Sequence, residues 1–312
     1  MKIAAYVKAL RPRQWTKNLI VFAAPLFAFS INIQSVLGSL LALVLFCSAS
    51  SSFYLLNDIA DVEADRSHPV KCKRPIAAGL VKIPVAIAMA VMLLGGALIF
   101  GWLRSPALGA TILSYAILQI AYNLKLKHTA ILDVMAIATG FVLRACAGAT
   151  ATGIVLSPWF MLCTAMLALF LGIEKRKAEL RLLQIKGGKT RAVLRRYSLG
   201  LLLRMESVVT NGAIITYAIW SAGPIVKGAS TPWMMLTLPF VLYGMFRYQL
   251  LSEPREISSL NENQNKNQVE SGVKTERPEE VLLQDFPIRF TVLSWVMTSF
   301  IIMYLNHKGI IR

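Results

Sequence analysis

The stretch YLLNDIADVEADRSHPVKCKRPIAAG, residues 54–79, carries four carboxylates and four Lys or Arg side chains between two strongly apolar segments. The apolar segment before it, residues 18–56, contains no Lys, Arg, Asp or Glu, and neither does the segment after it, residues 83–103. A helix needs about twenty apolar residues to cross a bilayer. The charged stretch is therefore predicted to lie at a membrane surface, joining two spans.

The rest of the chain repeats this apolar pattern. Its 312 residues are 56% hydrophobic and only 16% charged, and the apolar residues come in runs of spanning length. We expect an all-α, polytopic membrane protein with about nine transmembrane helices. Two come from residues 18–56, divided at the polar stretch 30–35, and the others from 83–103, 105–124, 131–150, 157–173, 198–222, 232–246 and 290–306.

The distribution of the 33 Lys and Arg residues predicts the orientation. With the N-terminus inside, 27 of them fall in cytoplasmic segments, four fall outside and two lie within spans. Short loops rich in Lys and Arg stay in the cytoplasm, so the stretch 54–79 is expected to face the cytoplasm at the inner (plasma) membrane. The basic segment 1–18 is expected to lie on the membrane surface, uncleaved, with Trp15 near the lipid headgroups.

Within this stretch, the oxygen-bearing side chains follow a helical spacing. Asn57, Asp61 and Asp65 are four residues apart, so a helix would place them on one face, with Asp58 beside them. Such carboxylates suit Mg²⁺, which binds one or two carboxylates together with substrate phosphates. We predict Asn57, Asp58, Asp61 and Asp65 as metal ligands and the three aspartates as catalytic. The alternative is a solvated surface patch, although residues 57–65 contain no Lys.

Cations follow the acids directly. Arg66, His68, Lys71, Lys73 and Arg74 are expected to bind phosphate charge that the metal leaves unneutralised. Pro69 and Pro75 favour a non-helical loop, which PIAAG at 75–79 closes. The net charge of +17 has a second explanation in topology and lipid headgroups, and no nucleic-acid partner is expected.

These residues carry a family resemblance. NDIADVEAD (57–65) and the loop that follows resemble the first aspartate-rich motif of the UbiA superfamily of intramembrane prenyltransferases, a nine-helix fold. LRPRQWTKN (10–18), YNLKLKH (122–128) and PEEVLLQD (278–285) resemble one branch of it, which moves 5-phosphoribose from phosphoribosyl diphosphate to a polyprenyl phosphate. The resemblance implies that activity, a Mg²⁺ cofactor, and further substrate contacts at Lys17, Tyr122 and Lys127.

The chain departs from aromatic prenyltransferases after the sixth span. Those enzymes carry a second acidic motif there, whereas this chain has EKRKAEL at 174–180. In the phosphoribosyl-transferring branch a similar KRxxEL pattern occurs, which implies that Lys175, Arg176 and Glu179 contact the substrate. A basic pair suits the 5-phosphate of the sugar donor. The alternative is that these cations only mark the cytoplasmic end of a helix.

Arg144 lies inside the fifth predicted span, where an ionisable side chain is expensive unless it faces the protein interior. It is interpreted either as a substrate contact, together with Lys127, or as a member of a structural ion pair. Asp133, close to the membrane edge, is expected to pair with Arg144 or with one of the nearby cations Lys125, Lys127 and His128. Arg204 is expected to pair with Glu206.

We interpret residues 1–312 as a single transmembrane domain whose cytoplasmic loop 247–289 holds a flexible polar insertion. Two rival functions remain: prenyl transfer to an aromatic acceptor, and transport of phosphorylated solutes. The sequence leaves the oligomeric state open.

Overall fold

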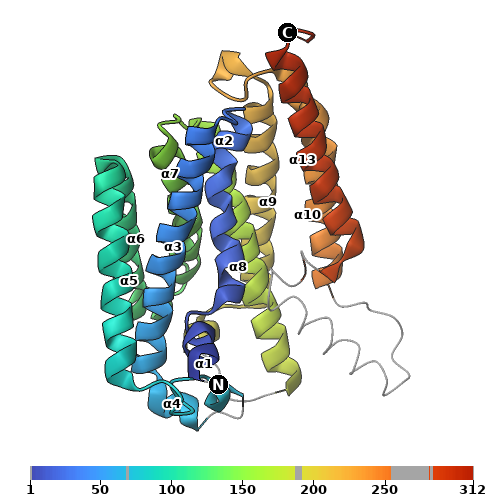
Figure 1. Ribbon diagram of the computed structural model, residues 1–312. Coiled ribbons are helices and arrows are strands. Elements are labelled where there is room, and N and C mark those ends of the chain that lie inside the picture. The colour runs from blue at the N-terminus through green and yellow to red at the C-terminus, as the bar shows by residue number, and fades with distance from the viewer. Residues whose placement is uncertain (1, 68–69, 187–191, 254–280, 282–283, 312) are drawn as a thin grey trace. The chain divides into compact units, whose positions relative to one another are not determined.

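A computed structural model describes residues 2–67, 70–186, 192–253, 281 and 284–311, and all regular secondary structure in these ranges is helical (Figure 1). The chain forms two compact units. The first comprises Met1–Leu26, Ser30–Leu124 and Leu143–Val155, and the second comprises Phe27–Phe29, Lys125–Val142 and Leu156–Arg312. The predicted all-α class is thus confirmed.

The first unit is built on three long helices. Helix α3 (Ile33–Ala60) packs against α5 (Ile83–Arg104), and α5 packs against α6 (Pro106–Leu124) (Figure 1). Phe46, Ile112 and Tyr115 lie in its buried core. The shorter elements are α1 (Lys2–Ala9), η1 (Pro12–Phe22), α2 (Ala23–Phe27), α4 (Val62–Arg66) and η2 (Lys71–Lys73).

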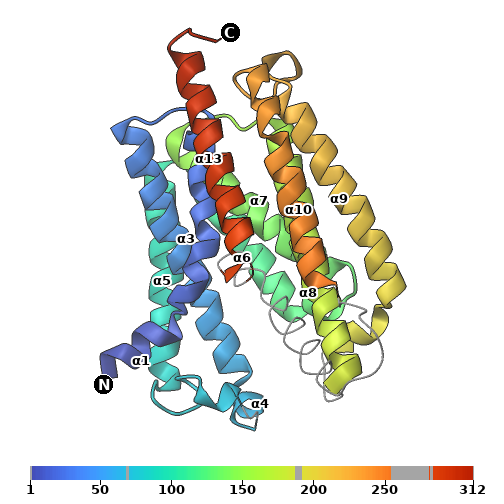
Figure 2. The same ribbon diagram turned by 90° about the vertical axis from the view of Figure 1, so that its right-hand side faces the viewer.

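The second unit pairs α8 (Pro158–Lys186) with α9 (Leu199–Ser221), and α10 (Leu238–Ser252) with α13 (Phe286–His307) (Figure 2). Phe170, Leu202 and Tyr248 belong to its core. Helix α7 (Leu132–Thr152) begins in this unit and ends in the first one. The short 3₁₀ elements are η3 (Leu126–His128), η4 (Ala192–Arg196), η5 (Pro224–Val226) and η6 (Pro232–Thr237).

Seven described helices are long and apolar enough to cross a membrane, so the expected number of nine is not confirmed. The first predicted span is divided between the 3₁₀ element η1 and the five-residue α2. The span predicted at 232–246 is divided between η6 and α10, which has 15 residues. At 1.5 Å per residue, α10 is roughly 22 Å long, which is shorter than the bilayer core of about 30 Å.

A glycine brings two backbones together in the first unit. A Cβ atom added at Gly148 of α7 would lie 1.8 Å from the carbonyl oxygen of Val21. Only glycine allows this approach. By contrast, no described atom outside the helix's own backbone lies within 4 Å of a Cβ built at Gly95 or Gly96 of α5.

The polar insertion predicted in loop 247–289 lies largely outside the described residues. The two ends of the loop are nevertheless joined, because Arg247 donates to both carboxylate oxygens of Asp285, at 3.4 and 3.0 Å. Asp285 also caps α13 by accepting from the backbone N–H of Ile288 at 2.9 Å. Burial would raise the pKa of Asp285, but these hydrogen bonds outweigh burial and hold it below its ordinary value.

Candidate active site

The central feature of the first unit is a pair of buried aspartates at the end of α3 and in α4. Asp58 and Asp65 are each 2% exposed. Arg74 joins them, because its Nη1 lies 3.1 Å from Asp58 Oδ1 and 2.6 Å from Asp65 Oδ2. One cationic nitrogen atom thus bridges the two carboxylates. In this geometry they are close enough to share a single positive charge.

Asp58 Oδ1 also accepts from the guanidinium of Arg11, a residue that no sequence motif had marked as part of the site. Arg11 precedes η1 and lies 47 residues from Asp58 along the chain. The only sequence signal for it is its place in LRPRQWTKN, where it is one of several basic residues. The site therefore contains two carboxylates and two guanidinium groups.

The predicted common face of Asn57, Asp61 and Asp65 is realised only in part. The helical hydrogen bonds continue through this region, from Asp61 N–H to Asn57 O and from Asp65 N–H to Asp61 O. However, Asp61 is exposed at the junction of α3 and α4, and Asn57 is half-buried. Among the described residues, no three Asp, Glu, His or Cys side chains form a metal-binding cluster. The buried pair is Asp58 and Asp65, seven residues apart.

The loop after α4 presents the predicted cations. Arg66, Lys71 and Lys73 are exposed, and Arg66 Nε donates to Ala77 O at 3.3 Å. His68 lies outside the described residues. The loop closes in the PIAAG segment as expected, with Ala78 N–H bonded to Arg74 O at 2.8 Å and Gly79 in the left-handed region at φ 71°. This turn holds Arg74 beside the two aspartates.

The N-terminal segment packs on α3. Ser51 Oγ donates to Leu10 O at 2.9 Å and accepts from the Trp15 indole N–H at 3.0 Å. The indole N–H of Trp15 is thus bound to the protein, and its expected position near the lipid headgroups stays a prediction. Lys17 lies half-buried in η1. The apolar pattern of the sequence did not predict the contacts of Leu10 and Trp15 with Ser51.

Arg144 is buried in the first unit, where neutral partners hold it. Its Nε donates to Asn18 Oδ1 at 2.7 Å, and its Nη2 donates to the Tyr115 hydroxyl at 3.1 Å. Asn18 also donates to Ser50 Oγ at 3.3 Å. These bonds connect η1, α3, α6 and α7, and both interpretations of Arg144, as a substrate contact or as part of an ion pair, stay predictions.

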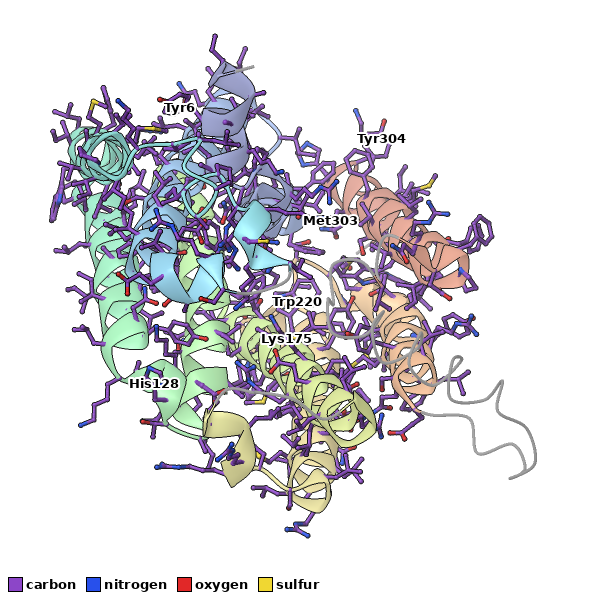
Figure 3. All side chains as sticks on the ribbon, turned by 90° about the horizontal axis from the view of Figure 1, so that it is seen from below. Tyr6, His128, Lys175, Trp220, Met303 and Tyr304 are labelled. Carbon is purple, nitrogen blue, oxygen red and sulfur yellow. The ribbon has the colours of Figure 1, made fainter. Side chains whose placement is uncertain are left out.

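The three consecutive cations of EKRKAEL have different surroundings. Lys175 is half-buried (Figure 3). Arg176 is 1% exposed, and it donates to Asp133 Oδ2 at 2.8 Å and to Glu179. Asp133 accepts from Tyr197 as well, at 2.6 Å. Arg176 can therefore reach a substrate only if these carboxylates release it. Asp133 pairs with this cation rather than with Lys127 or His128.

Tyr197 completes this cluster from the segment before α9. Its hydroxyl accepts from the Ile131 N–H at 2.6 Å while donating to Asp133. Burial and the bond to Asp133 raise the pKa of Tyr197 above its ordinary value. The hydroxyl consequently stays a donor at neutral pH.

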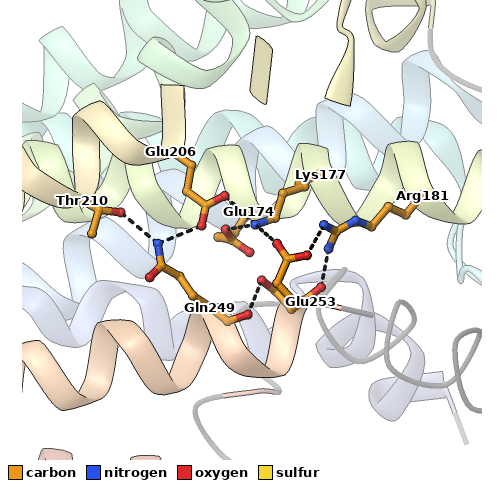
Figure 4. A network of polar contacts seen from close by, with 8 residues as sticks. Glu174, Lys177, Arg181, Glu206, Thr210, Gln249 and Glu253 are labelled. Atoms are coloured by element: carbon orange, nitrogen blue, oxygen red, sulfur yellow. Dashed lines mark hydrogen bonds and ion pairs between the residues drawn. The ribbon is translucent and has the colours of Figure 1, made fainter. Parts of the chain in front are cut away.

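Lys177, the third cation, is the centre of a buried network (Figure 4). It is 0% exposed and forms ion pairs with Glu174 at 2.7 Å, with Glu206, and with Glu253 at 3.2 Å. The expected pairing of Glu206 with Arg204 is therefore wrong. Glu206, a charged residue within the apolar run 198–222, indicated that a buried partner must exist. Only the fold shows that this partner is Lys177.

A cavity of about 340 Å³ opens beside this network in the second unit. Its lining combines carboxylate, amide and hydroxyl groups with one leucine, from α9, from α10 and from the residue after α10: Leu203, Glu206, Ser207, Thr210, Asn211, Gln249 and Glu253. Gln249 donates to Glu206 at 2.8 Å. Its acidic lining is unsuited to a phosphate group.

Two further predicted substrate contacts, Tyr122 and Lys127, lie in and after the last turn of α6. Tyr122 is half-buried near the end of α6 in the first unit. Lys127 is half-buried in η3, which belongs to the second unit, as does the exposed His128 (Figure 3).

The buried aspartate pair fits a divalent cation. Both groups supply hard oxygen ligands, and a positive nitrogen atom already bridges them. Asp61, which is exposed, and Asn57, which is half-buried, carry further oxygen atoms in the same segment of the chain.

Membrane-length helices with carboxylates and basic residues at the end of one of them are typical of intramembrane transferases. The chain belongs to the UbiA prenyltransferase family, whose sequence profile matches residues 19–262. The family resemblance seen in the sequence is confirmed.

Two relatives match over nearly the whole chain. The decaprenyl-phosphate phosphoribosyltransferase of Mycolicibacterium smegmatis is 34% identical, over 95% of this chain and 91% of its own. That of Mycobacterium tuberculosis strain CDC 1551 / Oshkosh is 35% identical, over 95% of this chain and 93% of its own. Among solved structures, a UbiA homologue from Archaeoglobus fulgidus bound to DMAPP and Mg²⁺ superposes with a TM-score of 0.65. It is 17% identical and covers 87% of this chain and 98% of its own, which establishes the shared fold.

Proposed function

We propose that this protein transfers 5-phosphoribose from phosphoribosyl diphosphate to a polyprenyl phosphate and releases diphosphate. The observation that carries the proposal is the match, at 34 and 35% identity over 95% of the chain, to two proteins named decaprenyl-phosphate phosphoribosyltransferase. The carboxylate and arginine site supports it, because it offers groups for both a metal and phosphate oxygens.

In this reaction the bond between the ribose C1 and the diphosphate oxygen breaks, and a bond from C1 to an oxygen of the acceptor phosphate forms. The acceptor is already an anion, so no strong general base is needed. Positioning and electrostatic stabilisation supply most of the rate enhancement. The exposed Arg66, Lys71 and Lys73 are suited to hold the donor phosphates, and Lys175 is proposed to meet the 5-phosphate.

Asp58 and Asp65 are proposed to hold Mg²⁺, with Asp61 and Asn57 completing its ligands or binding its water. When bound, Mg²⁺ would neutralise charge on the departing diphosphate. The Asp58 and Asp65 side chains are kept in place by their burial and by the turn that carries Arg74.

The multi-pass fold suits a lipid acceptor, whose isoprenoid tail stays in the membrane while its phosphate reaches the charged site. We place the protein in the inner (plasma) membrane, with this site facing the cytoplasm, because the basic loops predict that orientation.

The test is transfer by the purified protein, using phosphoribosyl diphosphate labelled in the ribose, a polyprenyl phosphate and Mg²⁺. We expect label in the lipid fraction and diphosphate release that requires both substrates. The rival function predicts prenylation of an aromatic acceptor from a prenyl diphosphate, with phosphoribosyl diphosphate ignored. That second result would overturn the proposal.

A further inference from the structure

We infer that Arg11 exchanges partners during the reaction: it neutralises Asp58 in the metal-free protein and binds the diphosphate group once a divalent cation occupies the carboxylates. This inference rests on the proposed function for the identity of the donor. The exchange itself requires only a diphosphate and a metal.

The first observation is the crowding of positive charge on one atom. Arg11 and Arg74 both donate to Oδ1 of Asp58, which is buried. Two guanidinium groups repel one another, so they stay together only while the carboxylate lies between them. A divalent cation on Asp58 and Asp65 would remove the negative charge that holds Arg11 there.

The second observation is the backbone of Arg11, which lies in the left-handed region at φ 55° and ψ 60°. This conformation is unfavourable for residues other than glycine, and such strain gathers at functional sites. A glycine would relieve the strain but would remove the guanidinium. The fold therefore keeps a strained residue at the point where its side chain reaches Asp58.

The third observation separates an anchored backbone from an accessible side chain. Leu10 is tied to α3 through Ser51, and Asn18 is tied to α3 through Ser50. The Arg11 guanidinium lies 5.0 Å from the centre of the Tyr54 ring, and its side chain is 29% exposed. The side chain alone can thus change partner while the segment stays in place.

The exchange predicts opposite effects on two ligands. Mg²⁺ alone must displace guanidinium groups from the carboxylates, so Arg11 weakens its binding. Diphosphate arriving with Mg²⁺ gains the freed Arg11 as a charged hydrogen-bond donor, so Arg11 strengthens its binding. A purely structural residue would change both affinities in the same direction.

The experiment measures binding of Mg²⁺ alone, and of inorganic diphosphate at saturating Mg²⁺, by calorimetry on the purified full-length protein. Arg11→Ala is compared with wild type and with Arg13→Ala. Arg13 is exposed two residues away, so its substitution removes the same charge from the same segment. We expect Arg11→Ala to tighten Mg²⁺ binding and weaken diphosphate binding, each about tenfold, from the loss of one charged hydrogen bond. Arg13→Ala should change each less than threefold.

If Arg11→Ala weakened the binding of Mg²⁺ and of diphosphate equally, or changed neither affinity, the exchange would be overturned. If Arg11→Ala does not fold, Arg11→Lys should change both affinities in the same opposite directions by a smaller factor, because lysine lacks the planar fork. Binding of phosphoribosyl diphosphate to wild type is measured in parallel. Its failure, with diphosphate binding intact, would reject the proposed donor and leave the exchange standing.

Discussion

Lys177→Met tests whether the buried cation of α8 is structural. Lys177 neutralises the charges of Glu174 and Glu206, which are both buried. It also pairs with Glu253, whose side chain is 47% exposed and has a second partner in Arg181. Methionine fills a similar volume but leaves the two buried glutamates without this cation. Breaking a buried ion pair on one side removes about 3–5 kcal/mol of stability. The Glu253 pair adds little because solvent screens it.

The measurement is the free energy of unfolding in mixed detergent micelles, titrated with a denaturing detergent and followed by circular dichroism. The matched control is Lys175→Met, which makes the same change two residues earlier at a half-buried position. We expect it to lose clearly less stability than Lys177→Met, because Lys175 is half-buried and Lys177 is 0% exposed. Adding Glu174→Gln and Glu206→Gln to Lys177→Met should restore at least half of the loss, because the buried charges then disappear together. Wild-type stability of Lys177→Met alone would refute the reasoning.

Three further outcomes are expected. Asp65→Asn or Asp61→Asn should each remove most of the transfer activity in a folded protein, and excess chelator should do the same to wild type, whereas full turnover in any of these cases would exclude the metal assignment. Lys175→Ala should raise the KM for phosphoribosyl diphosphate more than the KM for the acceptor. An unchanged donor affinity would mean that Lys175 only marks the cytoplasmic end of the helix. The pKa of Asp285 is lowered on folding, so its contribution to stability should be present above the unfolded pKa of about 3.9 and be lost as the pH falls through the folded pKa. Asp285→Asn should therefore flatten the acid side of a plot of unfolding free energy against pH. An unchanged plot would contradict this.

The sequence was sufficient for the features that depend on local pattern. Apolar runs predict long helices because each spanning helix satisfies its own backbone hydrogen bonds. The four-residue spacing of Asn57, Asp61 and Asp65 drew attention to residues 57–65, and its interpretation as a metal site stays a prediction. It did not identify Asp58 and Asp65 as the buried pair, because burial depends on Arg74 and on the turn behind it.

The pairings that the sequence did not predict join residues far apart along the chain. Arg176 meets Asp133 across 43 residues, and Lys177 meets Glu206 across 29. In the sequence both cations look like the basic end of a cytoplasmic helix. Hydropathy also could not separate a continuous span from one divided by a 3₁₀ segment, since both have the same composition, as residues 232–252 illustrate.

The structure changes what the net charge of +17 means for substrate binding. Several cations are already bound to carboxylates: Arg11, Arg74, Arg176, Lys177, Arg181 and Arg247. A cation in such a pair attracts a phosphate group only weakly, because the neighbouring carboxylate repels the phosphate. In the first unit, we propose that the exposed loop cations Arg66 and Lys73 attract the donor. Arg11 and Arg74 add to this attraction only when a metal takes their place on Asp58 and Asp65, so metal and diphosphate should bind cooperatively.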